Sequence, residues 1–178
     1  MHAIVDAFVL AVKMIFTGNA EVYGITARTL EISLSSTAIG ALLFGPLGCL
    51  IYFNNFRGKS ALISVIQTCY SLPTVFVGLL VFLVFSRAGP LGFFGIMFTP
   101  RLMVIGQVVL ISAIVTGLTI SALSGISLAI REPAISLGAS RFQSVWAVLK
   151  EARVAVLTAI LVGFGRAISE VGLALMVG

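Results

Sequence analysis

The chain has 178 residues, of which 60% are hydrophobic and only 10% are charged, and its formal net charge is +5. Soluble domains average about 45–50% apolar and about 25% charged residues, so this chain has too few charges to cover an exterior in water. The composition excludes a cytosolic globular domain, a disordered chain and a disulfide-built secreted domain. Its Lys and Arg residues are scattered between apolar blocks, which is typical of a membrane protein and does not indicate a nucleic-acid partner.

Residues 1–31 predict a short amphipathic helix at the membrane interface, followed by a linker. Thr17-Gly18-Asn19 is typical of a helix end. A cleaved signal peptide is the alternative, but the basic start is missing and no small-residue cleavage site follows. The apolar side chains that recur at helical spacing on one side of the segment are Ile4, Val5, Phe8, Val9, Val12, Ile15 and Phe16.

Four long apolar runs follow, at residues 32–53, 60–86, 102–130 and 154–178. The first three carry no charge and exceed the ~20 residues that a helix needs to cross the hydrocarbon core. The fourth is interrupted by Arg166 and Glu170. We therefore expect an all-α bundle of about four membrane-spanning helices, forming one domain over residues 32–178.

Pro73 lies inside the second apolar run. A proline there removes a backbone donor and predicts a kink in the helix. Such a kink serves either the fit between neighbouring helices or a hinge, and the sequence leaves both interpretations open.

The connections between the runs differ in positive charge, which predicts the topology. With four spans, residues 54–59 and 131–153 share one face of the membrane, and this face holds more Lys and Arg than the other. Because cytoplasmic loops carry the excess, we expect the 131–153 segment inside and the N-terminus outside. The residues counted on the inner face are Arg57, Lys59, Arg131, Arg141, Lys150 and Arg153; those on the outer face are Lys13, Arg28, Arg87 and Arg101.

Motifs for catalysis by this chain alone are missing. The sequence contains no GxxxxGK[ST], HExxH or GxSxG pattern and no plausible pair of catalytic carboxylates. Cys49 and Cys69 lie inside apolar runs without Cys or His partners nearby, and the single histidine is at position 2. We therefore expect no metal site, no cofactor and no enzymatic activity of its own.

The polar segment 131–153 predicts a helix, a bend and a second helix between two spans. Pro133 suits the first turn of a helix, Gly138 suits its end, and Ser140 suits the cap of the next helix. The segment either presents a rigid surface to a cytoplasmic partner or is an amphipathic connector resting on the membrane. The second helix is expected to form an apolar face from Phe142, Val145, Trp146 and Leu149.

Glu132, Ala134 and Gly138 have the spacing of the Glu-Ala-Ala-xxx-Gly motif, the EAA loop of ABC importer permeases, and the resemblance extends from about Thr29 to the end of the chain. Pro133 departs from the motif, and Lys150-Glu151 stand where many members have Leu-Pro. The resemblance implies a MetI-like type I permease fold, a homodimer in membrane lipid, a separate ATPase subunit and an extracytoplasmic substrate-binding protein. It implies that the loop couples to the ATPase through Glu132, Ala134, Leu137, Gly138, Ala139 and Ser140.

Residues 163–172 place an arginine and a glutamate inside an otherwise apolar run, which is costly unless they face protein or water. Arg166 and Glu170 are four residues apart and could form an intrahelical ion pair. Alternatively, Arg166, Ser169 and Glu170 belong to a substrate pathway, in which Arg166 and nearby backbone amides meet an anion. Gly165 and Gly172 would then let the helix break and present a helix end.

This segment, together with residues 71–73 and 87–92, resembles the tungstate-type permeases, which are related to the molybdate permeases. The resemblance implies import of a tetrahedral oxyanion, tungstate or molybdate, across a bacterial or archaeal cell membrane by alternating access. The alternative is a membrane scaffold or assembly protein that transports nothing. Members of the family carry a further span after the Arg–Glu segment, so a C-terminally truncated permease that lacks its final span is expected.

Overall fold

The computed structural model describes the chain except for residues 1–6, 8, 10–12 and 15–16, and it also leaves the side chains of Leu128 and Glu132 undescribed. The described residues form helices and no strands, which confirms the all-α prediction. Most of the expected interfacial helix at the N-terminus lies outside the described residues. The helices are α2 (Ala20–Phe53), α3 (Lys59–Thr68), α4 (Thr74–Phe85), α5 (Pro100–Ser136), α6 (Arg141–Ile168) and α7 (Gly172–Val177), with short 3₁₀ turns at Cys69–Ser71 and Gly92–Phe94.

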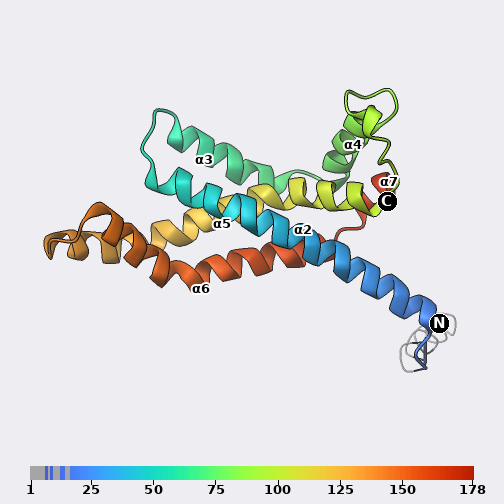
Figure 1. The fold of residues 1–178 in the computed structure, drawn as a ribbon, viewed down its shortest axis with the longest axis horizontal. Helices are drawn as coiled ribbons and strands as arrows, with labels where there is room; N and C mark the ends of the chain where they lie inside the picture. Colours follow the sequence, from blue (N-terminus) through green and yellow to red (C-terminus); the bar gives the residue numbers. More distant parts are fainter. Residues whose placement is uncertain (1–6, 8, 10–12, 15–16) are drawn as a thin grey trace.

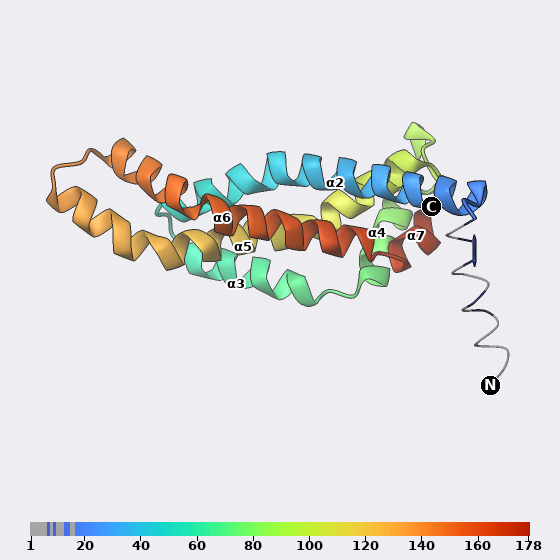
Figure 2. The same cartoon turned by 90° about the horizontal axis from the view of Figure 1, so that it is seen from below.

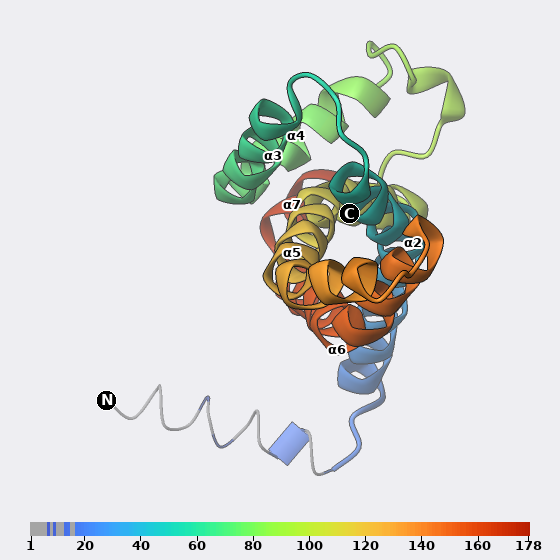
Figure 3. The ribbon, with the colours of Figure 1, turned by 90° about the vertical axis from the view of Figure 1, so that its left-hand side faces the viewer.

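Three long helices, α2, α5 and α6, run along the long axis of the molecule, with α5 in contact with both of the others (Figure 1). Viewed along that axis, they form one group, and α3 and α4 lie outside it (Figure 3). Small residues let the backbones approach, because Gly40 faces Ile111 and Gly48 faces Thr116 and Thr119. Close packing of small residues therefore replaces the hydrophobic driving force that a lipid environment does not provide.

Helix α2 begins earlier than the first apolar run. Asn19 caps it, since its side-chain oxygen accepts hydrogen bonds from the backbone N–H groups of Glu21 and Val22 at 3.0 and 3.4 Å. The helix then continues without a break through residue 31, the expected end of the N-terminal segment. Its first three turns consequently carry charged residues, which hydropathy alone had excluded from the span.

The second apolar run is not one straight helix. Helix α3 with its 3₁₀ turn and helix α4 meet at an angle of 100°, and the break between them contains Leu72 and Pro73. Pro73 has extended backbone angles and stands at the start of α4. The chain therefore bends sharply at the proline for which the sequence predicts a kink.

The four apolar runs do not each contain one long, unbroken helix. By length and composition, two helices among the described residues could cross a membrane, within Ala20–Phe53 and Pro100–Ser127, and the bent α3–α4 pair adds a third if it is one broken span. The fourth run divides, because α6 ends at Ile168 and the chain turns before the short α7. A hydropathy run records apolar length, and it does not record where the helix inside it ends.

Two apolar clusters stabilise opposite ends of the bundle. At one end, Leu102 of α5 packs with Val81 of α4 and Leu173 of α7. At the other end, Leu123 of α5 packs with Val148 and Ala152 of α6. Beyond this second cluster, the α5–α6 hairpin projects past the end of α2 (Figures 1 and 2).

Candidate functional site

The turn at the tip of the α5–α6 hairpin is a Schellman motif. Gly138 has a φ of +84°, a left-handed conformation that costs glycine little. Its N–H donates to the carbonyl of Ile135 at 2.9 Å, and the N–H of Ala139 donates to the carbonyl of Ala134 at 3.0 Å. Both bonds satisfy carbonyl groups that the end of α5 would otherwise leave free, so the direction of the turn is determined locally.

A capping box starts the second arm of the hairpin. The Ser140 hydroxyl oxygen accepts a hydrogen bond from the N–H of Gln143 at 3.3 Å, and the Gln143 side-chain oxygen accepts one from the N–H of Ser140 at 2.8 Å. The reciprocal bonds satisfy two donors at the start of α6. Schellman motif and capping box together make the hairpin a rigid unit.

One detail of the hairpin differs from the sequence-based prediction. Pro133 does not lie in the first turn of a new helix; it lies inside α5, near the end of that helix. The expected apolar residues of α6 are divided between two environments, because Leu149 packs against the Leu123 cluster while Phe142 and Trp146 are 78% and 63% exposed. The face that packs within the bundle also contains Ser144, Val148 and Ala152, because small side chains allow α6 to approach α5 closely.

Exposed apolar side chains therefore gather at the tip. Leu137 is 89% exposed, and Ile135 and Phe142 are also exposed. Of the residues expected to couple to an ATPase, Ala134, Leu137, Gly138, Ala139 and Ser140 lie in or beside this turn. The side chain of Glu132 lies outside the described part of the chain.

The segment with Arg166 and Glu170 forms a helix break at the opposite end of α6. Among the residues that the structure describes, no ion pair joins Arg166 to Glu170, because α6 ends between them and the Glu170 carboxylate has another partner. That carboxylate accepts a hydrogen bond from the N–H of Leu173 at 2.8 Å and so caps α7. Ser169 turns back on α6, where its hydroxyl donates to the carbonyl of Arg166 at 3.1 Å.

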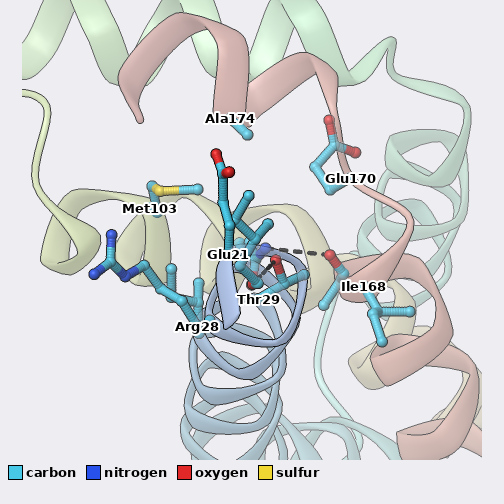
Figure 4. Close-up of a pocket in the computed structure, with 12 residues that line it drawn as sticks. Glu21, Arg28, Thr29, Met103, Ile168, Glu170 and Ala174 are labelled. Atoms are coloured by element: carbon cyan, nitrogen blue, oxygen red, sulfur yellow. Dashed lines mark hydrogen bonds between the residues drawn. The ribbon is translucent and has the colours of Figure 1, made fainter. Parts of the chain in front are cut away.

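A cavity of about 460 Å³ lies between this break and the first turns of α2. Of the predicted pathway residues, only Glu170 is among those that line it. In Figure 4, Glu21 points towards Ala174, Arg28 lies on the side of Met103, and Glu170 lies on the other side. The wall thus carries charges of both signs.

The floor of the cavity holds a residue that the sequence analysis did not select. Gln107 of α5 is only 4% exposed. Its Oε1 accepts a hydrogen bond from the Ser36 hydroxyl of α2 at 2.7 Å, and its Nε2 donates to the carbonyl of Ala167 of α6 at 3.1 Å. A sequence signal did exist, since Gln107 is the single Asn or Gln within the apolar run 102–130.

Arg28 and Glu21 were also missed as lining residues. Both belong to the part of α2 that precedes the first apolar run, which was expected to be a linker. The described residues contain no group of three or more His, Cys, Asp or Glu side chains able to hold a metal ion.

Residues 37–178 match the family described as the binding-protein-dependent transport system inner membrane component. The chain belongs to this family. The match confirms the resemblance to ABC importer permeases and places the chain in a membrane as one component of a transport system. The long apolar α2 and α5 agree with that location.

Known permeases resemble this chain over most of its length. It is 40% identical over 154 residues to a probable anion ABC transporter permease protein of Haloferax volcanii, an alignment that covers 86% of this chain and 66% of the relative. It is 34% identical over 178 residues to the tungstate uptake system permease protein TupB of Peptoclostridium acidaminophilum, covering 100% of this chain and 78% of the relative. The TupB protein of Campylobacter jejuni is 32% identical over 175 residues, covering 98% and 73%. The chain thus spans about two thirds to three quarters of the length of these permeases.

Proposed function

We propose that this permease imports a tetrahedral oxyanion, with tungstate as the cargo and molybdate as the alternative, by alternating access driven by ATP hydrolysis on a separate subunit. The observation that carries this proposal is the rigid α5–α6 hairpin with exposed apolar side chains at its tip. Similarity to two tungstate permeases and one anion permease supports the choice of cargo.

The hairpin suits mechanical contact with an ATPase. Helix α6 has 28 residues, which corresponds to about 42 Å at ~1.5 Å per residue. It joins the capped turn at Ser140 to the break at Ile168 beside the cavity. A continuous helix moves as one body, so a displacement of the tip reaches the cavity wall.

The surface at the tip supports the same role. Leu137 and Phe142 are far more exposed than residues of the bundle interior, and Arg141 lies between them in the chain. Large apolar side chains in an exposed cluster mark an interaction site. In our proposal, residues 131–153 lie in the cytoplasm and contact the ATPase subunit, the N-terminus lies outside, and an extracytoplasmic binding protein delivers the anion to a permease homodimer in membrane lipid.

The α6–α7 break is the proposed pathway element. Arg166 supplies positive charge close to the break, while Ser169 and Glu170 shape the turn that follows. Gly165 and Gly172 lie on either side of it, and Pro73 marks the bend at the start of the neighbouring α4. The proposal assigns the anion to this region, with Arg28 on the facing wall of the cavity.

The test is reconstitution of the full chain in proteoliposomes with its ATPase and binding protein. We expect ATP-dependent uptake of tungstate, competed by molybdate according to the selectivity of the binding protein, and little competition by sulfate. Vesicles without ATP and vesicles without the binding protein are the controls. ATPase binding without any ion uptake would contradict the proposal and favour a scaffold.

A further inference from the structure

We propose that Gln107 is a positioning residue of the transport cycle, a releasable tie that holds the α6–α7 break against α2. The inference rests on the proposed function for its link to transport, but the tie itself is a property of the fold. The side chain of Gln107 extends from α5, lines the cavity, and forms hydrogen bonds with both α2 and α6.

The orientation of the amide follows from its partners. The carbonyl of Ala167 can only accept, so the Gln107 NH₂ group must face it, and the side-chain oxygen is left to accept from Ser36. Ser36 and Ala167 are almost fully buried. Three helices thus meet at one amide that is shielded from solvent.

Both partners have alternative hydrogen bonds, which lowers the free-energy cost of separating Gln107 from them. The Ser36 hydroxyl has a single hydrogen, and it also lies 3.1 Å from the carbonyl of Ser33 in its own helix. The carbonyl of Ala167 is also approached by the N–H of Glu170 at 3.3 Å. When Gln107 leaves, neither partner remains buried without a hydrogen bond, so the usual penalty for breaking a buried bond is avoided.

The Gln107 amide also has access to other hydrogen-bond partners, because it lines the cavity. A polar occupant or water there can take over the hydrogen bonds of the amide. The neighbouring residue in α5 marks the same contact region, since Gly106 leaves space for the side chain of Leu173 of α7. Gln107 thus contacts the α6 side of the break, and Gly106 contacts the α7 side. An occupant of the cavity competes with Ser36 and Ala167 for the hydrogen bonds of the Gln107 amide.

The experiment combines spin-label distances with transport assays. Labels at Ile25 of α2 and Ile168 of α6, in a chain with Cys49 and Cys69 replaced by alanine, report the distance across the cavity. In Gln107→Met, which keeps the bulk but removes both bonds, we expect a second, longer distance population.

Two further variants control for a purely structural effect. Thr116→Val removes a hydrogen bond to the carbonyl of Ser112 within α5, and we expect distances like those of the wild type. Ser36→Ala removes one of the two bonds of the tie, so we expect a smaller shift in the direction of Gln107→Met. If Gln107→Met does not fold, the label distances in Ser36→Ala test the tie in its place.

The transport readout separates positioning from folding. In reconstituted vesicles, we expect Gln107→Met to raise ATP hydrolysis without liganded binding protein by roughly three- to tenfold, the range for one or two hydrogen bonds in a membrane. Unchanged label distances in folded Gln107→Met, or in Ser36→Ala if the former does not fold, would overturn the inference. Failure of wild-type vesicles to transport would instead refute the proposed function, while the label distances would still report on the tie.

Discussion

At the scale of single residues, local chemistry and distant contacts differ in how far the sequence reveals them. Gly138 and Ser140 are recognisable in advance because their roles depend on neighbours within a few positions. Gln107 bonds Ser36 and Ala167, which lie 71 and 60 positions away. No local sequence pattern predicts partners at such separations, so these hydrogen bonds are recognised only from the tertiary structure.

Replacing Gly138 tests the turn at this scale. A Cβ there would meet no atom within 4 Å, so the cost of Gly138→Ala is backbone strain at φ +84° and not a clash. We expect a loss of about 1 kcal/mol in the local stability of the turn. Hydrogen exchange of the Ala139 amide should then be roughly fivefold faster.

Gly125 provides the matched control. It also has open space at its Cβ position, but it lies inside α5 with ordinary helical geometry. Gly125→Ala should leave exchange at Ala139 unchanged. Equal acceleration in both variants would show that the left-handed backbone at Gly138 is not what holds the turn.

At the scale of helices, the differences between expectation and structure lie mainly at the helix ends. The apolar runs predict where helices can lie in lipid, but capping side chains near the helix ends decide where the helices begin and end. Asn19 starts α2 well before residue 32, and Glu170 caps α7 inside the last run. Which face of α6 is buried depends on packing: small residues such as Ser144 face the bundle and Trp146 is exposed, because packing between membrane helices favours small side chains.

The exposed tip of the hairpin gives a prediction at this scale. Leu137→Asp places a charge on a side chain that is 89% exposed, so the fold should tolerate it while contact with the ATPase weakens. We expect the amount of ATPase that co-purifies to fall at least tenfold, with an unchanged melting temperature, because a buried unpaired charge is costly in an interface.

Arg57→Gln is the control for the change of charge. Arg57 is exposed, lies between α2 and α3, and its replacement also lowers the net charge by one. We expect this variant to bind the ATPase as the wild type does. If Leu137→Asp recovers a normal amount of ATPase, the hairpin tip is not part of the coupling interface.

At the scale of the whole molecule, the long axis separates two ends with different chemistry. The hairpin tip lies at one end and α7 lies at the other (Figure 1). Ala174 of α7 lines the cavity. In our proposal, the first end faces the ATPase and the second faces the binding protein. The same proposal places the hairpin end on the cytoplasmic side, because more Lys and Arg are predicted to lie on that face.

Topology is testable with single cysteines in a chain lacking Cys49 and Cys69. Phe93 and Leu137 are both highly exposed, and the segments that contain them, the α4–α5 connection and the hairpin tip, lie at opposite ends (Figure 1). A membrane-impermeant maleimide should label Phe93→Cys on intact cells, and Leu137→Cys only after permeabilisation. The reverse pattern would invert the proposed topology and place the hairpin tip away from the ATPase.

The sequence by itself determined the membrane environment, the helical class, the family resemblance and the capped turn of the hairpin, because composition and local hydrogen bonding depend on few neighbours. Only the tertiary structure decided the cavity and the role of Gln107. Each of these requires residues far apart in the chain to meet, and apolar length contains no information about such meetings.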